Sequence, residues 1–314
     1  MSKRIVIFVA LALMAFSPIA GARDIHSKAG TSAFPFLKIN VGARAVAMGG
    51  AFTGLADDET ALYYNPAGIA GMEHKRFVLG YHNYFVDIQS GFTGFIFPLD
   101  ETNSLGAYVS YLNYGEFTAT DSRGDATGET FGGGDLMVAF SYARLLSNRF
   151  RIGGSAKFIY EKLDEFSASG AAVDLGAKYV DDRERLGLGL MVQNLGAQLS
   201  SLGQEKFDLP LTFRGGLSYK PVGLPLTLVA DGIAPVDNNF DIAIGAEYHE
   251  LKPFYIRLGW SSFGSNYKAA DSKDAWAGVS LGFGLDVQKF HIGYALQSAA
   301  DLGNTHRITF TGTM

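Results

Sequence analysis

The chain has 314 residues, with 26 Lys and Arg against 31 Asp and Glu, and its formal net charge is −5 at pH 7. This acidic balance gives no electrostatic footprint for nucleic acid, and the complete absence of Cys excludes disulfides and thiolate metal sites. A content of 39 Gly, 24 Phe and 15 Tyr with only 18% charged residues favours many β-strands, some of which face something other than water.

Residues 1–22 have the features of a cleaved secretory signal peptide. Lys3 and Arg4 form a basic start, residues 5–16 are an unbroken apolar run, and residues 20–22 offer an A-x-A cleavage site. The apolar run is shorter than the ~20 residues of a membrane-spanning helix. The sequence therefore predicts an exported protein that begins at Arg23, without a lipid anchor on an N-terminal Cys.

Residues 42–72, GARAVAMGGAFTGLADDETALYYNPAGIAGM, differ from everything that follows them. Gly49 and Gly54 have the spacing of a phosphate-binding loop, but Leu55 and Ala56 stand where Lys followed by Ser or Thr is required. No β-α-β unit surrounds the segment. A nucleotide site is therefore excluded.

The same segment predicts two short helices over residues 43–51 and 60–64, with the carboxylates of residues 57–59 charging the first turn of the second. Asn65, Pro66, Ala67 and Gly68 predict a turn, because Pro66 favours an extended Asn65 and Gly68 permits a positive φ. A compact insert of small residues is what a plug inside a barrel requires. We therefore expect a hatch over residues 23–75.

From Arg76 onward, apolar and polar or small residues alternate with period two, which is typical of strands with two different faces. Most runs exceed the ~5–6 residues of globular strands and match the ~9–11 that cross a membrane. Residues 76–314 therefore predict an all-β fold, a membrane β-barrel of about 14 antiparallel strands. The runs lie near 76–87, 89–98, 104–114, 133–146, 150–163, 169–181, 185–195, 209–220, 224–234, 239–249, 253–263, 275–285, 287–297 and 305–314.

The predicted connections support the barrel independently. Connections after even-numbered runs are mostly tight, whereas long ones at residues 115–132, 196–208, 264–274 and 298–304 follow odd-numbered runs. Short periplasmic turns opposite longer extracellular loops are the pattern of a barrel in an outer membrane of the Gram-negative type. A soluble β-sandwich or propeller is the alternative, but neither a repeat of 40 to 50 residues nor short strands support it.

The segment from residue 42 to 72 resembles the N-terminal signature of the PorV/PorQ family of outer-membrane proteins. That family is related to FadL-type barrels for hydrophobic compounds, whose N-terminal hatch also carries Asn-Pro-Ala, here Asn65, Pro66 and Ala67. The resemblance implies fourteen strands and a hatch in the lumen, at about residues 24–72. The chain is shorter than typical FadL transporters, and it ends in Met314 where an aromatic residue is usual.

The sequence contains no signature of an enzyme or of a cofactor site. The six His residues form no closely spaced metal-binding set, and for a lone His on the polar side of a strand the expected role is hydrogen bonding in the lumen. They are His26, His74, His82, His249, His291 and His306.

Charged residues on the polar faces of the strands should line the lumen, because Arg or Lys on the lipid face costs ~2–4 kcal/mol at the midplane. We expect these residues to pair with each other and with the hatch, rather than to line a charged ion channel. They are Lys157, Glu161, Asp174, Arg214, Asp241, Glu247, Arg257 and His291, together with Lys178, Asp231, Asp286 and Lys289.

Two main functions follow. The barrel binds or passes a hydrophobic small molecule across the outer membrane, which the hatch motif and strand count favour. Alternatively, as the resemblance implies, it is an accessory of a type IX-like secretion system that receives or attaches cargo at the cell surface. A barrel with only a structural role is a third reading. The expected partners are outer-membrane lipid, an apolar ligand, and secretion-system or cargo proteins.

Overall fold

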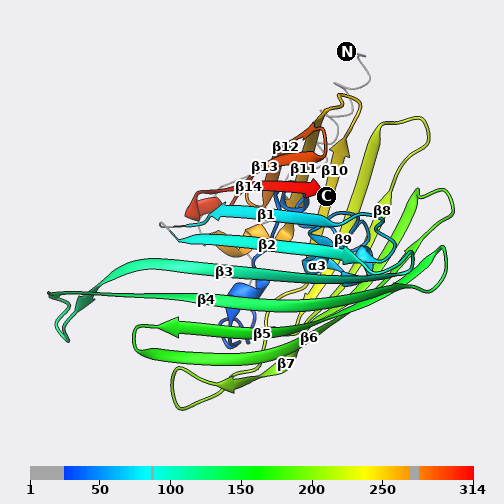
Figure 1. Ribbon diagram of the computed structural model, residues 1–314. Coiled ribbons are helices and arrows are strands. Elements are labelled where there is room, and N and C mark those ends of the chain that lie inside the picture. The colour runs from blue at the N-terminus through cyan, green and yellow to red at the C-terminus, as the bar shows by residue number, and fades with distance from the viewer. Residues whose placement is uncertain (1–24, 86–87, 269–275) are drawn as a thin grey trace.

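The computed structural model describes residues 25–85, 88–268 and 276–314. The predicted signal peptide at residues 1–22 lies outside the described residues. Fourteen strands form one closed barrel in which every strand pairs antiparallel with its neighbours in the sequence, and β1 closes the ring with β14 (Figure 1). This confirms the predicted all-β class and the strand number.

The strands begin near the predicted positions. Their bounds are β1 Arg76–Asn83, β2 Gln89–Pro98, β3 Asn103–Thr120, β4 Ala126–Leu145, β5 Phe150–Leu163, β6 Phe166–Val180, β7 Leu186–Ser200, β8 Thr212–Tyr219, β9 Leu226–Pro235, β10 Asp241–Tyr248, β11 Phe254–Ser261, β12 Val279–Val287, β13 Phe290–Ser298 and β14 Asn304–Thr313.

Along each strand, the alternation of polar or small and apolar residues places successive side chains on the lumenal and the outer face of the barrel wall. In β10, Asp241 and Glu247 point inward and are buried, whereas Ile242 points outward and is 47% exposed. Outward apolar side chains such as Leu190 and Phe283 cover the wall elsewhere. This is the surface that lies against the hydrocarbon of a bilayer.

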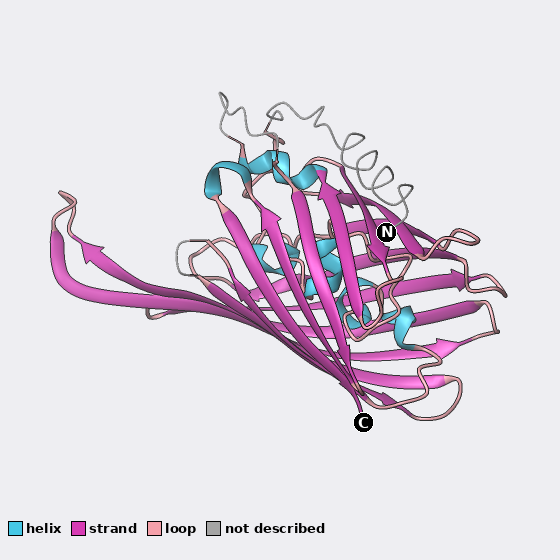
Figure 2. Cartoon of the chain, turned by 90° about the horizontal axis from the view of Figure 1, so that it is seen from above, coloured by secondary structure: helices cyan, strands magenta, loops and turns pink. Residues whose placement is uncertain are grey.

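The two ends of the barrel differ, although less in loop length than predicted. At one end, here called the turn end, connections between strands have two to six residues. At the other, the loop end, connections of 11 and 17 residues follow β7 and β11. Residues 115–132 were predicted as a loop, which is wrong: β3 and β4 continue as a paired ribbon past the rim (Figures 1 and 2). Residues 298–304 form only a short connection that contains η4 Ala300–Leu302.

Four short helices precede β1 and lie inside the barrel: η1 Pro35–Lys38, α2 Ala43–Ala47, α3 Ala61–Tyr64 and η2 Pro66–Ile69 (Figure 2). The segment enters at the loop end, where the Ala33 amide donates to the Asp208 carbonyl, and it reaches the turn end before Arg76. Helix α2 contacts β11 to β14, and η2 contacts β3 to β6 on the other side of the lumen. The principal core therefore lies between this hatch and the wall.

The remaining helix, η3 Ser262–Tyr267, lies in the connection after β11. Across the described ranges, no helix combines the length and the apolar character needed to cross a membrane.

Candidate functional site

The turn at Asn65 fastens the hatch to the barrel wall. The fully buried Asn65 amide donates to the Thr53 carbonyl in the hatch and to the Ala177 carbonyl in β6, both at 3.1 Å. Its Oδ1 accepts from the Ala67 amide at 3.2 Å and so caps η2. Because the Asn65 side chain forms hydrogen bonds both within the hatch and with β6, the motif orients the hatch relative to β6.

Glycines in the wall make room for this turn. A Cβ added at Gly176 would lie 2.2 Å from Asn65 Oδ1, and one at Gly153 would lie 2.6 Å from the Ala67 nitrogen. At Gly189 the added atom would lie 2.0 Å from the Thr53 carbonyl oxygen. Polar groups of the hatch therefore contact the sheet directly.

The expected positive φ at Gly68 is wrong. Asn65 is extended as predicted, with a φ of −168°, but Gly68 lies within η2 and is not among the residues with positive φ. The requirement for glycine comes instead from a close approach, since a Cβ there would lie 2.2 Å from the Ala56 carbonyl oxygen.

The first polar cluster joins β5, β6 and β7. Lys157 Nζ lies 2.5 Å from Asp174 Oδ2 and donates to Asn194 Oδ1 at 2.9 Å, and both charged groups are almost fully buried. Asp174 also accepts from the Asn194 backbone amide at 2.8 Å. Glu161 lies farther along the same face of β5, opposite Asp135 in register.

A second cluster binds the hatch backbone. Asp231 in β9 accepts from the amides of Phe52 and Thr53 at 3.1 and 2.9 Å. Arg214 in β8 lies 3.4 Å from Asp231 and donates to the Gly50 carbonyl at 2.8 Å. The pair therefore binds both a carbonyl and amides of residues 50–53.

A third cluster lies near the turn end and includes a hatch residue. Arg44 in α2 forms two hydrogen bonds with Glu247 at 2.8 and 2.9 Å, and Arg257 donates to the same carboxylate at 2.7 Å. Beyond Arg257, His291 lies 3.2 Å from its guanidinium and 2.6 Å from Asp286. The chain of charges links the hatch to β10, β11, β12 and β13.

The hatch carboxylates at residues 57–59 were predicted to charge the first turn of a helix. Asp58 does accept a hydrogen bond from the Thr60 amide at the start of α3, at 2.8 Å, and all three carboxylates also lie near arginines. Asp57 and Asp58 lie 2.6 and 3.1 Å from Arg44. Burial lowers the pKa of Arg44, but Asp57, Glu247 and Asp58 outweigh burial and raise that pKa well above its usual value. Burial, together with Asp58, raises the pKa of Glu59 to about 7, although Arg76 lies 3.5 Å away.

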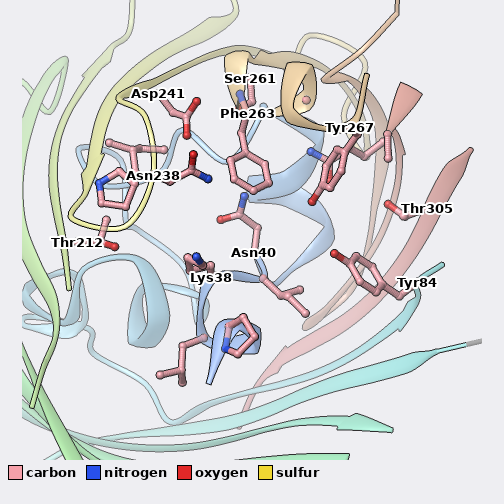
Figure 3. A pocket seen from close by; sticks show the side chains of 18 of the residues that line it. Lys38, Asn40, Tyr84, Thr212, Asn238, Asp241, Ser261, Phe263, Tyr267 and Thr305 are labelled. Atoms are coloured by element: carbon pink, nitrogen blue, oxygen red, sulfur yellow. Dashed lines mark hydrogen bonds between the residues drawn. The ribbon is translucent and has the colours of Figure 1, made fainter. Parts of the chain in front are cut away.

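A cavity of about 270 Å³ opens between the hatch and the wall near the loop end (Figure 3). Apolar and aromatic side chains from Leu37, Ile233 and Phe263 line part of it. Polar groups converge on it as well, among them Asp241, which accepts a hydrogen bond from Ser262 at 3.0 Å. Such a mixture of apolar lining and few polar groups is typical of a small-molecule site.

Two further cavities, of about 380 and 310 Å³, lie near the turn end. Charged side chains dominate both, including Arg44, Asp57 and His291. In the part of the chain that the structure describes, no group of three or more acidic or His residues could hold a metal ion.

The three clusters hold eight of the twelve sequence-predicted lumenal residues: Lys157, Asp174, Arg214, Asp231, Glu247, Arg257, Asp286 and His291. Outside them, Asp241 lies at the loop-end cavity, Glu161 lies farther along β5, and Lys178 donates to the hatch carbonyls of Leu55 and Ala56. Lys289 lies in the turn between β12 and β13. Sequence reasoning missed Arg44 and Arg307. Arg44 stands out in retrospect as the one cation in an Ala-rich segment, and Arg307 as a cation on the inward face of the final alternating run.

Comparisons with known proteins agree with this architecture. A family model described as "PorV: Type IX secretion system protein PorV" matches residues 22–220, more than half of the chain. The Pseudomonas putida toluene transporter TodX is similar with a TM-score of 0.62 and 14% identity, over 88% of this chain and 99% of that one. A Pseudomonas aeruginosa FadL homologue is similar with a TM-score of 0.57 and 12% identity, over 94% of this chain and 99% of that one. At these identities the likeness shows the fold, and no curated protein matches the sequence.

Proposed function

The chain belongs to the PorV family, and we propose that this FadL-like outer-membrane barrel binds a hydrophobic or amphipathic small molecule in its loop-end cavity. The observation that supports the proposal is the cavity itself, in which apolar side chains and a few polar groups face one space of about 270 Å³. The ligand would enter from the loop end, above the hatch.

In this proposal the hatch determines whether the ligand passes through the barrel. Residues between 33 and 72 are mostly buried, and their polar groups are bonded to opposite sides of the wall at Asn65, Asp231 and Glu247. Passage to the turn end would require these bonds to break together. The resting protein is therefore a binding protein with a closed lumen, and transport would depend on displacement of the hatch.

Native mass spectrometry of the protein purified from its own outer membrane tests the proposal. We expect a small molecule of constant mass to remain bound and to be released on activation. Asn40 projects into the cavity (Figure 3), so Asn40→Phe should fill the space and remove the bound mass. Asn113→Phe is the matched control, because Asn113 is exposed on β3. A wild-type protein that carries no small molecule would refute the proposal.

A second candidate function is that of an accessory in type IX-like protein secretion. The description of the family favours it, and the ribbon formed by residues 115–132 offers a surface for a protein partner beyond the barrel rim (Figure 2). The connections at 196–208 and 264–274 are further candidate surfaces, although residues 269–274 lie outside the described residues. Deletion of the gene should then prevent delivery of secreted proteins to the cell surface, whereas unchanged delivery would contradict this role.

A further inference from the structure

Two cations face one another on the lumenal side of the wall near the turn end. Arg151 in β5 and Lys178 in β6 are direct partners in the strand register, and both side chains point into the lumen. Side chains in this relation have Cβ atoms about 4.5–5.5 Å apart, and like charges there are destabilising. Because Lys178 is only 5% exposed, water and salt screen the repulsion poorly.

Neither cation has a counter-ion. Lys178 Nζ donates to the hatch carbonyls of Leu55 and Ala56, the latter at 2.8 Å. Arg151 Nη1 donates to the Ala70 carbonyl at 3.1 Å, and its Nε is buried without a hydrogen-bond partner. Among the residues that the structure describes, no carboxylate forms an ion pair with either cation. A buried charge is costly unless it is paired, so this arrangement is incomplete.

Cations elsewhere in the lumen show what is missing here. Lys157 and Arg214 lie 2.5 and 3.4 Å from carboxylates in neighbouring strands. Arg76, also near the turn end, lies 3.5 Å from Glu59. The wall therefore supplies carboxylates where it needs them, and it supplies none between β5 and β6 at this end.

The two cations line the cavity of about 310 Å³ near the turn end, and Lys220, directly after β8, lines it as well. The carboxylates at this cavity do not neutralise the cations. Asp57 lies 2.6 Å from Arg44, whereas Glu73 and Glu184 are exposed and form no ion pair within the described part of the chain. The cavity thus combines free space with cations that lack partners.

We propose that this turn-end cavity binds a small oxyanion, a phosphate or a carboxylate, between Arg151 and Lys178. Both side chains keep donors for it, because a guanidinium has five N–H groups and an ammonium has three. Such groups bind carboxylate and phosphate oxygens through charge-assisted hydrogen bonds.

The bound anion would act on the hatch. It removes the repulsion between the two cations while they keep their bonds to the carbonyls of Leu55, Ala56 and Ala70. It therefore favours the closed hatch from the end opposite the loop-end cavity. The inference does not depend on a ligand in that other cavity.

A comparison of anions at equal ionic strength tests the site. The protein, in nanodiscs of zwitterionic lipid, receives inorganic phosphate, succinate or chloride, and hydrogen exchange is followed in peptides that cover residues 54–57 and 68–72. A ligand at about 100 times its Kd that binds only the closed form slows opening about 100-fold, so phosphate or succinate should slow exchange by this factor relative to chloride. The same protection in nanodiscs with anionic phosphatidylglycerol, without added phosphate, would assign the anion to a lipid head group.

A variant locates the effect. Arg151→Gln removes one charge but keeps a group that can donate to the Ala70 carbonyl. In chloride it should unfold at the wild-type temperature or above, because the like-charge repulsion is gone, and phosphate or succinate should no longer slow exchange. Lys252→Gln is the matched control, since Lys252 is exposed in the turn between β10 and β11, and it should respond to the anions as the wild type does.

The outcomes decide the proposal without reference to the loop-end cavity. Equal exchange of the wild type in chloride, phosphate and succinate would overturn it, and this comparison holds even if Arg151→Gln fails to fold. Protection that persists in Arg151→Gln would mean a general salt effect and would overturn it too. Occupancy of the loop-end cavity is measured separately, by native mass spectrometry.

Discussion

Neighbouring glycines in β8 provide a direct test of how the hatch packs against the wall. Gly216 faces the lumen, and a Cβ added there would lie 2.3 Å from Asp231 Oδ1 and 2.5 Å from the Gly54 nitrogen. Gly215 faces outward, and its added Cβ would meet only Leu190 Cδ2 at 3.6 Å, an ordinary contact. The substitutions Gly216→Ala and Gly215→Ala therefore differ in where the methyl group lies and not in its chemistry.

The expected cost of Gly216→Ala has two parts. Overpacking of a filled interior costs ~1–3 kcal/mol. The displaced Asp231 also weakens its hydrogen bonds with the amides of Phe52 and Thr53, at ~1.5–3 kcal/mol for a bond to a charged group. Because the bonds are weakened and not lost, a total of about 3 kcal/mol, in the lower part of the summed range, is expected, which corresponds to about 100-fold in an opening equilibrium. Gly215→Ala should be neutral or stabilising by up to ~1 kcal/mol, because Gly is unfavourable within a strand.

Opening of the hatch can be measured by hydrogen exchange with mass spectrometry, which gives the exchange rates of backbone amides in hatch peptides. In Gly216→Ala, peptides that cover residues 50–56 should exchange about 100-fold faster, the figure that ~3 kcal/mol predicts. The same peptides in Gly215→Ala should exchange as in the wild type. Equal exchange in both variants would show that the hatch does not rest against β8 as described.

Three further perturbations address other contacts of the hatch. Asn65→Ala removes two donated and one accepted hydrogen bond, and should speed exchange of residues 65–69 about 100-fold at ~1 kcal/mol per bond, whereas the control Asn103→Ala, at the start of β3, should leave it unchanged. Glu247→Gln leaves two buried guanidinium groups without their shared carboxylate, and should cost ~3–5 kcal/mol, seen as a lower apparent unfolding temperature in detergent; an unchanged temperature would contradict the ion-pair account. Because the pKa of Glu59 is raised to about 7, its contribution to stability is present in acid and lost as the pH rises through 7. Glu59→Gln should therefore unfold at a higher temperature than the wild type at pH 8 and at a similar one at pH 5, and an identical pH dependence of the two proteins would contradict this.

Much of the barrel could be predicted from sequence because one physical constraint acts on nearly every strand. A strand between lipid and lumen must alternate, as Asp241, Ile242 and Ala243 do, so the pattern shows both the strand and its inward face. The ribbon at 115–132 escaped prediction because it lies beyond the rim, where neither lipid nor lumen imposes the alternation. There the backbone pairs from Glu116 and Gly132 to Thr120 and Ala126, with register shifts and in a Gly-rich context.

The hatch and its site were predictable only in part. Small residues and Asn65-Pro66 predicted a compact insert, but its attachment depends on wall positions more than 100 residues away, such as Gly176 and Glu247. No local pattern shows that a glycine in an alternating run meets the hatch backbone.

A high-resolution structure of the protein isolated from its native outer membrane, without added ligand, tests the central claim most directly. The account predicts a closed lumen with the hatch bonded at Asn65, and density for one small molecule in the loop-end cavity. A lumen that is open from end to end, or a cavity that holds only water, would contradict it.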